Sequence, residues 1–311
     1  MSHWELDSTL FLSSRLPDHT PAEEAACVLC ADPTSGDQPQ TVCVVDVNPT
    51  SRFYGEVARE IALDQDVSTG NASAAAGASE PGTAHRIAPR VLLAHDPTCP
   101  YGFVSSGFSL HNLSSAISVW RRYDGPEQDA PWALRKVIAI PDEPAGANQL
   151  PALLRPVGAI PALITDIALS PDDRFLYIAC WGTGDLKQFD VSNPLRPREV
   201  ASVRIGGVAS RAAHPSQAQQ LTGGPATVTV SRDGRRIYLT NSLSRSWDTR
   251  LYPDGLRGWM VKLDADPAGG LAFDPNFFVD FGDQRPQEVR LPGQGRGERV
   301  TPPGAFQQRS R

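Results

Sequence analysis

Two histidines stand on expected loops, where an imidazole can bind a transition metal. His95 follows the apolar run 90–94, and His214 lies in the polar stretch 211–215, ahead of Gly223. Neutral imidazole nitrogen suits copper, iron or zinc. We therefore take His95 and His214 as candidate metal ligands. A surface histidine with no ligand is the alternative at each position.

The cysteines are the other residues that could do chemistry. Cys27 and Cys30 form a single Cys-x-x-Cys pair, whereas a structural zinc site needs two such pairs or added histidines. We expect two strand cysteines of which one faces inward. Five cysteines are an odd number in a large domain that needs no disulfides, so reduced thiols are expected. Cys180, followed by Trp181, is interpreted as a packing residue.

Familiar catalytic motifs are missing from the chain. It contains no Gly-x-Ser-x-Gly elbow, no Walker loop and no His-Glu-x-x-His. The glycine cluster 293–297 does not lie between a strand and a helix, so phosphate binding there is not favoured. The residues therefore assign no catalytic group.

A repeated phrase indicates the elements that position these side chains. Ser170 to Tyr177 and Ser231 to Tyr238 share Ser, Asp, Arg and Tyr at the same offsets, 61 residues apart. Apolar alternation precedes and follows each phrase, which predicts strand, tight turn and strand, used twice. A four-stranded unit repeated every 40 to 50 residues or so is typical of a β-propeller blade. The longer interval here predicts long loops.

Composition changes along the chain predict its organisation. We expect a disordered N-terminal tail over 1–21, opening strands over 22–63, a low-complexity linker over 64–89, further strands over 90–293 and a disordered C-terminal tail over 294–311. Helical periodicity is weak throughout. An all-β fold follows from this pattern.

Charge and hydropathy exclude some partners. The formal net charge is −6 with no run of Lys and Arg, so a nucleic-acid partner is not expected. No segment has about 18 consecutive apolar residues, so no transmembrane segment is expected. The acidic residues near the N-terminus do not fit a signal peptide, and the protein is expected in the cytoplasm.

Several longer stretches resemble the selenium-binding protein / methanethiol oxidase family. The resemblance runs from about Arg90 to Gly293, and more loosely over 22–54. It is carried by the following segments: Gly158–Trp181, Gly184–Pro194, Arg232–Tyr238, Ser246–Asp248, Tyr252–Asp254 and Asn276–Gly282. The resemblance extends over about 200 residues, so it is more specific than a match to a short motif.

The resemblance implies a fold, an activity and site residues. It implies a cytosolic seven-bladed β-propeller that binds selenium. In bacterial and animal members it implies copper-dependent oxidation of methanethiol to formaldehyde, hydrogen peroxide and hydrogen sulfide. Histidines would hold the copper. His214 and His95 fall on matching positions, and Cys30 matches an early family cysteine, the candidate for selenium or thiol binding.

The chain departs from the family in three places. The family's tandem His-His and its cysteine-rich stretch should follow Tyr54, but 64–89 stand there instead, so an internal deletion of two or more blades is inferred. Gln287 stands where the family has a histidine, and an amide is a far poorer copper ligand than imidazole. The family's closing Gly-Gly-Asp-Ser-Ser-Asp run is replaced by 293–299.

Two hypotheses follow. The first is a shortened selenium-binding member with impaired methanethiol oxidase chemistry, whose partner is a small thiol or selenium compound. The second is a non-catalytic propeller remnant that serves as a binding or interaction scaffold. Missing blades expose faces where neighbours should stack, which predicts self-association through the exposed blade edges.

Overall fold

The protein is described by a computed structural model that covers residues 23–30, 41–62, 90–96, 101–109, 112–122, 132–217 and 220–292. Its described part is all-β apart from one short helix, and it contains four separate four-stranded antiparallel sheets. This confirms the expected all-β class. The tails expected over 1–21 and 294–311, and the linker expected over 64–89, lie outside the described residues.

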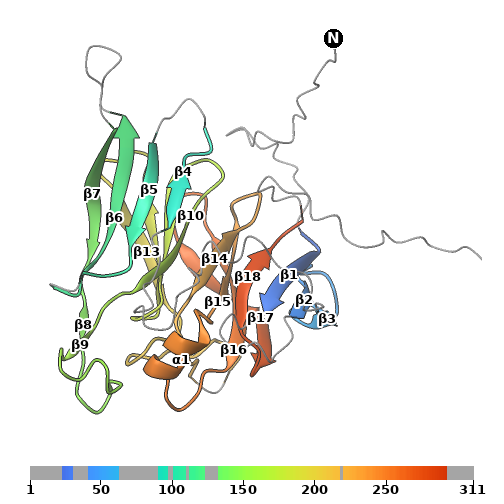
Figure 1. Ribbon diagram of the computed structural model, residues 1–311. Helices are drawn as coiled ribbons and strands as arrows, with labels where there is room; N and C mark the ends of the chain where they lie inside the picture. The colour runs from blue at the N-terminus through green and yellow to red at the C-terminus, as the bar shows by residue number, and fades with distance from the viewer. Residues whose placement is uncertain are drawn as a thin grey trace, which may run out of the picture.

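In three of the four sheets every strand pairs with its neighbour in sequence, and in the fourth a strand from the C-terminal end joins three N-terminal strands (Figure 1). The first sheet has the order β4-β5-β6-β7, followed by a two-stranded pair, β8 and β9. Their bounds are Val91–Leu93, Tyr101–Ser106, Ser115–Arg122 and Trp132–Ile140 for β4 to β7, and Glu143–Pro144 and Ala159–Ile160 for β8 and β9.

The next two sheets contain the repeated phrase. The bounds of β10 to β13 are Ile164–Leu169, Phe175–Cys180, Asp185–Asp190 and Arg198–Arg204. The bounds of β14 to β17 are Thr227–Val230, Arg236–Thr240, Gly258–Ala265 and Leu271–Gly282. The helix α1, Arg245–Leu251, lies between β15 and β16 and was not expected from the sequence.

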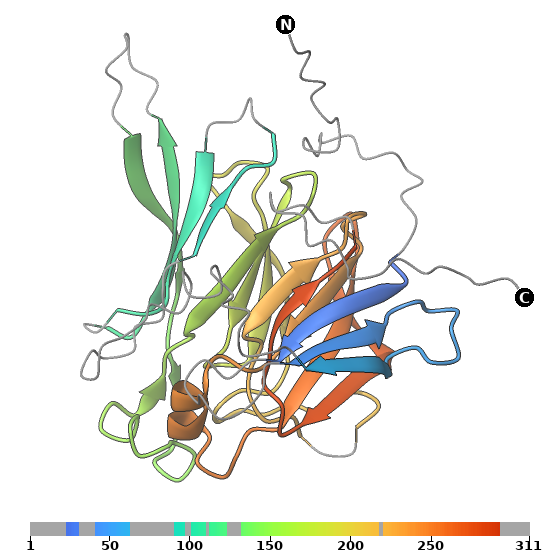
Figure 2. The ribbon, with the colours of Figure 1, turned by 45° about the vertical axis from the view of Figure 1, so that its right-hand side comes forward.

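The two ends of the described chain share the fourth sheet. Its order is β18-β1-β2-β3, with bounds Pro286–Arg290, Ala25–Cys30, Thr41–Asp46 and Val57–Ala62. The C-terminal strand β18 is therefore the first strand of a sheet that the N-terminal strands complete. Figure 2 shows this blue and red sheet beside the orange one.

The two hairpin turns confirm the repeat at the level of single hydrogen bonds. Asp172 Oδ1 accepts from Ser170 Oγ (2.5 Å) and Arg174 N (3.2 Å), and Ser170 Oγ accepts from Phe175 N (2.9 Å). The second turn has the same three bonds. Asp233 Oδ1 accepts from Ser231 Oγ (2.5 Å) and Arg235 N (3.0 Å), and Ser231 Oγ accepts from Arg236 N (2.9 Å). The Ser-x-Asp spacing thus closes each turn, because the side chains satisfy backbone N–H groups that the strands leave free.

The apolar cores lie between successive sheets. One core joins β4–β7 to β10–β13, a second joins β10–β13 to β14–β17, and a third joins β14–β17 to the fourth sheet. Tyr177 and Tyr238 of the repeat are both buried, the first in the second core and the second in the third. Each sheet therefore packs face to face against the next one, as the ribbons in Figures 1 and 2 show.

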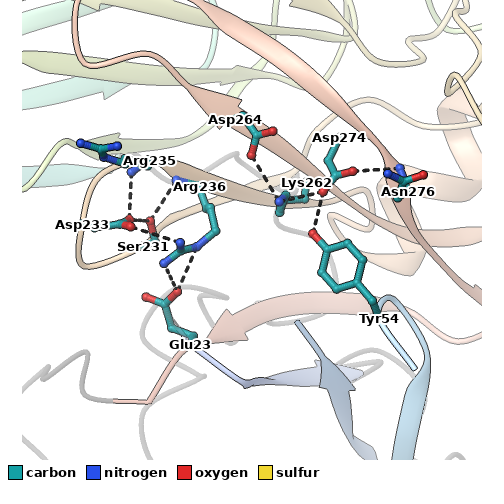
Figure 3. A network of polar contacts seen from close by, with 10 residues as sticks. All are labelled: Glu23, Tyr54, Ser231, Asp233, Arg235, Arg236, Lys262, Asp264, Asp274 and Asn276. Carbon is teal, nitrogen blue, oxygen red and sulfur yellow. Dashed lines mark hydrogen bonds and ion pairs between the residues drawn. The ribbon is translucent and has the colours of Figure 1, made fainter. Parts of the chain in front are cut away.

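Polar contacts fasten the fourth sheet to its neighbour (Figure 3). Tyr54 donates to Asp274 Oδ2 (2.6 Å) on β17, and Lys262 Nζ lies 2.7 Å from the same oxygen. Glu23, just before β1, pairs with Arg236 of β15 at 2.6 Å. Residues more than 200 positions apart in sequence are thereby held together.

Candidate functional site

Cys30 and Cys43 form a buried pair of thiols on neighbouring strands. Their Sγ atoms lie 3.8 Å apart, and the residues are 5% and 0% exposed. In the register of β1 and β2, Cys30 faces Thr41 and Cys43 faces Val28, so the two cysteines are diagonal neighbours on one face of the sheet. Cys27 is exposed, which confirms that one cysteine of the Cys-x-x-Cys pair faces inward and one does not.

The thiol pair has a polar neighbour from the opposite end of the chain. Cys43 Sγ donates to Gln284 Oε1 at 3.3 Å, and Gln284 lies in the turn between β17 and β18. The hydrogen bond between the thiols raises the pKa of Cys30, which burial and Glu60 raise further. The same bond lowers the pKa of Cys43, against the opposing effects of burial and Glu60. The Cys43 thiol is therefore the more readily ionised of the two. A thiolate is the reactive form of cysteine.

His95 is held by the turn of the first repeat. Its Nδ1 lies 2.7 Å from Asp173 Oδ1, which also accepts from His95 N, while Asp173 Oδ2 accepts from Asp96 N. Burial would raise the pKa of Asp173, but these bonds lower it overall. Asp173 has a φ of +57°. The equivalent residue of the second repeat is Gly234, whose φ is +71°. The aspartate thus occupies a left-handed position, and its carboxylate fixes the segment after β4.

His214 is packed between aromatic rings and is 1% exposed. Its ring lies 5.2 Å from that of Phe273 and 5.4 Å from that of Phe278, both on β17. Its Nδ1 accepts from Ser216 N at 3.2 Å. Burial lowers the pKa of His214, although the nearby Asp274 opposes this. The surroundings favour the neutral imidazole, and its Nε2 is buried without a hydrogen-bond partner among the described residues.

The described residues do not bring the candidate ligands together. The contacts of His95 and those of His214 have no residue in common. Over the described ranges, no three His, Cys, Asp or Glu side chains gather as a metal site would need. Gln287, where the family resemblance implies a histidine, lies on β18 with its Nε2 buried and without a hydrogen-bond partner among the described residues. The metal role of His95 and His214 stays a prediction.

Cys43, Gln284 and Asp173 are the residues that sequence reasoning missed. Strands were expected over 22–63, but the pairing register that sets Cys43 beside Cys30 is not specified by the pattern of either strand alone. Cys180 is fully buried in the first core and Trp181 is also fully buried, which agrees with the packing interpretation. Burial strongly raises the pKa of the Cys180 thiol, so it is the less reactive kind of cysteine.

The fold and the thiol pair define an all-β protein of stacked antiparallel sheets with a buried dithiol. Residues 73–297 match the family described as 56 kDa selenium binding protein (SBP56). The chain therefore belongs to the SBP56 family.

Curated relatives and a solved structure agree with this membership. The chain is 38% identical over 223 residues to methanethiol oxidase of Mus musculus and 36% identical to selenium-binding protein 2 of the same species. Each match covers 64% of this chain and 44% of the relative, so the chain matches less than half of the relatives' length. A solved hypothetical selenium-binding protein from Sulfolobus tokodaii has a TM-score of 0.79 and 27% identity, covering 93% of this chain and 98% of the other.

Within the residues that the structure describes, no helix is long and apolar enough to cross a membrane.

Proposed function

We propose that this chain binds a small selenium or thiol compound through Cys30, with Cys43 as the second sulfur. The observation that carries the proposal is the 3.8 Å separation of the two Sγ atoms at a buried position. Membership of the SBP56 family, whose match covers residues 73–297, supports selenium as the ligand. The choice of Cys30 and Cys43, which lie outside that match, rests on their geometry. A cytoplasmic location is part of the proposal, because free thiols persist in a reducing compartment.

The chemistry balances if an external thiol acts as the reductant. Selenous acid, the two protein thiols and two molecules of a small thiol give a protein S–Se–S bridge, one small-molecule disulfide and three waters. The two external thiols supply the electrons that reduce selenium, and the oxygens leave as water. The protein contributes two sulfurs on adjacent strands, so one selenium atom can be held by both.

We also propose that the four sheets are blades of an incomplete β-propeller. Each is a four-stranded antiparallel sheet, and successive sheets pack face to face. Strands from both ends of the chain share one sheet, as in a propeller whose last blade joins the two ends of its chain. The chain matches 44% of the length of its curated relative from Mus musculus, which supports the loss of two or more blades.

Copper-dependent methanethiol oxidation is not included in the proposed function. In the described residues His95 and His214 do not share a copper site, because their contacts have no residue in common and no three His, Cys, Asp or Glu side chains gather there. No step is therefore derived through copper. A non-catalytic propeller scaffold is the second candidate, and the poor fit of these histidines favours it over an oxidase.

Selenium capture tests the proposed function. The purified chain, treated with selenite and excess glutathione and then desalted, is expected to retain one selenium per chain by elemental analysis. Cys30→Ser is expected to reduce the retained selenium to background, because one sulfur of the bridge is lost. Cys180→Ser and Cys27→Ser are matched controls that should leave it unchanged. Undiminished selenium in Cys30→Ser protein would overturn the proposal.

Self-association is proposed at the outer face of β4. Val91 and Leu93 are each 61% exposed, and β4 ends its sheet with β5 as its neighbour. A second copy of the chain would cover this apolar face and edge. The double variant Val91→Lys, Leu93→Lys is expected to shift the chain toward monomer in analytical ultracentrifugation. Leu153→Lys, at an exposed apolar residue away from β4, is the control. An unchanged sedimentation profile in the double variant would exclude this face.

A further inference from the structure

We infer that Cys30 and Cys43 form the core of a binding site for one d¹⁰ divalent metal ion of the zinc type. This inference goes beyond the proposed function, because metal binding needs no reductant and no selenium. It begins from the position of the two cysteines on one face of β1 and β2. Each sulfur comes from a hydrogen-bonded strand, so the pair is fixed before any ligand arrives.

The distance between the sulfurs matches a tetrahedral site. Zinc–sulfur bonds are about 2.3 Å long, and two such bonds at the tetrahedral angle separate their sulfurs by about 3.8 Å. The observed Sγ–Sγ distance is 3.8 Å. A disulfide would instead need the sulfurs to approach to about 2.05 Å. Metal binding therefore requires less movement of the strands than oxidation does.

One further donor lies next to the pair, and a second is on the neighbouring strand. Gln284 Oε1 lies 3.3 Å from Cys43 Sγ, and Glu60 on β3 is directly opposite Cys43 in the strand register. Directly opposite residues share a face of the sheet. Glu60 is exposed, and no three His, Cys, Asp or Glu side chains are already gathered in the described part of the chain. The two sulfurs are thus pre-placed, and Glu60 would have to turn inward to complete the set.

The electrostatics of the pair favour a cation. A metal ion replaces the thiol protons, and it also offsets the repulsion between Glu60 and the thiolates. Thiolates select soft and borderline metals over magnesium or calcium. Histidines do not take part in this site, so it is separate from the copper site that the family resemblance implies.

Metal titration of the reduced, full-length chain tests the inference. With zinc, and with cadmium as an ultraviolet reporter of metal–sulfur bonds, we expect one ion per chain. Cys30→Ser and Cys43→Ser should each weaken binding by more than about 100-fold, beyond the 10- to 100-fold effect typical of removing an outer-shell group. Glu60→Gln should weaken it by a smaller factor. Cys27→Ser and Cys180→Ser should leave the affinity and the cadmium–sulfur band unchanged.

Other results would overturn the inference. These are zinc affinity that survives both Cys30→Ser and Cys43→Ser, binding that is lost in Cys27→Ser instead, or no binding by a chain whose thiols titrate as reduced. Circular dichroism of each variant checks that the sheets are intact. The selenium experiment is read separately: selenium capture without zinc binding rejects this inference alone, and zinc binding without selenium capture rejects the proposed function alone.

Discussion

Replacing Gly206 with alanine is expected to destabilise the protein by more than about 4 kcal/mol, the range reserved for severe single substitutions. Gly206 has a φ of +84°, and a Cβ there would lie 2.1 Å from the carbonyl oxygen of Gly223. The backbone cannot yield cheaply, because Gly207 N donates to the same oxygen at 3.3 Å and Ile205 N donates to Gly184 O. Urea denaturation followed by tryptophan fluorescence measures the loss.

Gly255→Ala separates backbone strain from collision. Gly255 has a φ of +99° with no atom within 4 Å of the added Cβ. The Gly255→Ala substitution should therefore lower the free energy of unfolding only by the strain of an alanine at positive φ, about 1 to 3 kcal/mol. If Gly206→Ala were no more destabilising than Gly255→Ala, the close packing of the loops that precede β14 would not be a source of stability.

The elements that sequence reasoning predicted are those specified by local chemistry. Ser170 and Asp172 close their turn with bonds to residues at most five positions away, and Ser231 and Asp233 do the same. Alternating apolar residues on either side supply the strands. Because these turn-closing bonds are short-range, the repeated phrase predicts both hairpins. The family resemblance then adds the wider context that two hairpins cannot supply.

The candidate site was predicted only in part, because its geometry depends on long-range pairing. Cys30 was identified, but its partner Cys43 and the neighbour Gln284 come from another strand and from the far end of the chain. His214 was predicted on a loop, as found, but its burial against Phe273 and Phe278 depends on how that loop folds back over β17. Helix α1 was missed because one turn or two of helix has no clear periodicity.

The second large effect is expected from Glu23→Gln, which should destabilise the protein by about 3 kcal/mol. The Glu23 side chain is 3% exposed and its Oε2 lies 2.6 Å from Arg236 Nη2, while its Oε1 accepts from Arg232 N. Removing one charge of a buried pair leaves the other desolvated, and Asp233, 3.1 Å from Arg236, compensates only in part. Urea denaturation of both proteins measures the difference.

The position of Glu23 gives this substitution a second readout. Glu23 lies two residues before β1, and its partner Arg236 belongs to β15. The ion pair therefore holds the strands that contain Cys30 and Cys43 against the neighbouring sheet. Loosening it should raise the rate at which a thiol reagent modifies the two buried cysteines. Glu199→Gln is the matched control, because its partly exposed pair with Lys187 should contribute no more than about 1 kcal/mol. Equal stability and equal thiol reactivity in Glu23→Gln and Glu199→Gln proteins would show that the Glu23–Arg236 ion pair does not hold the fourth sheet in place.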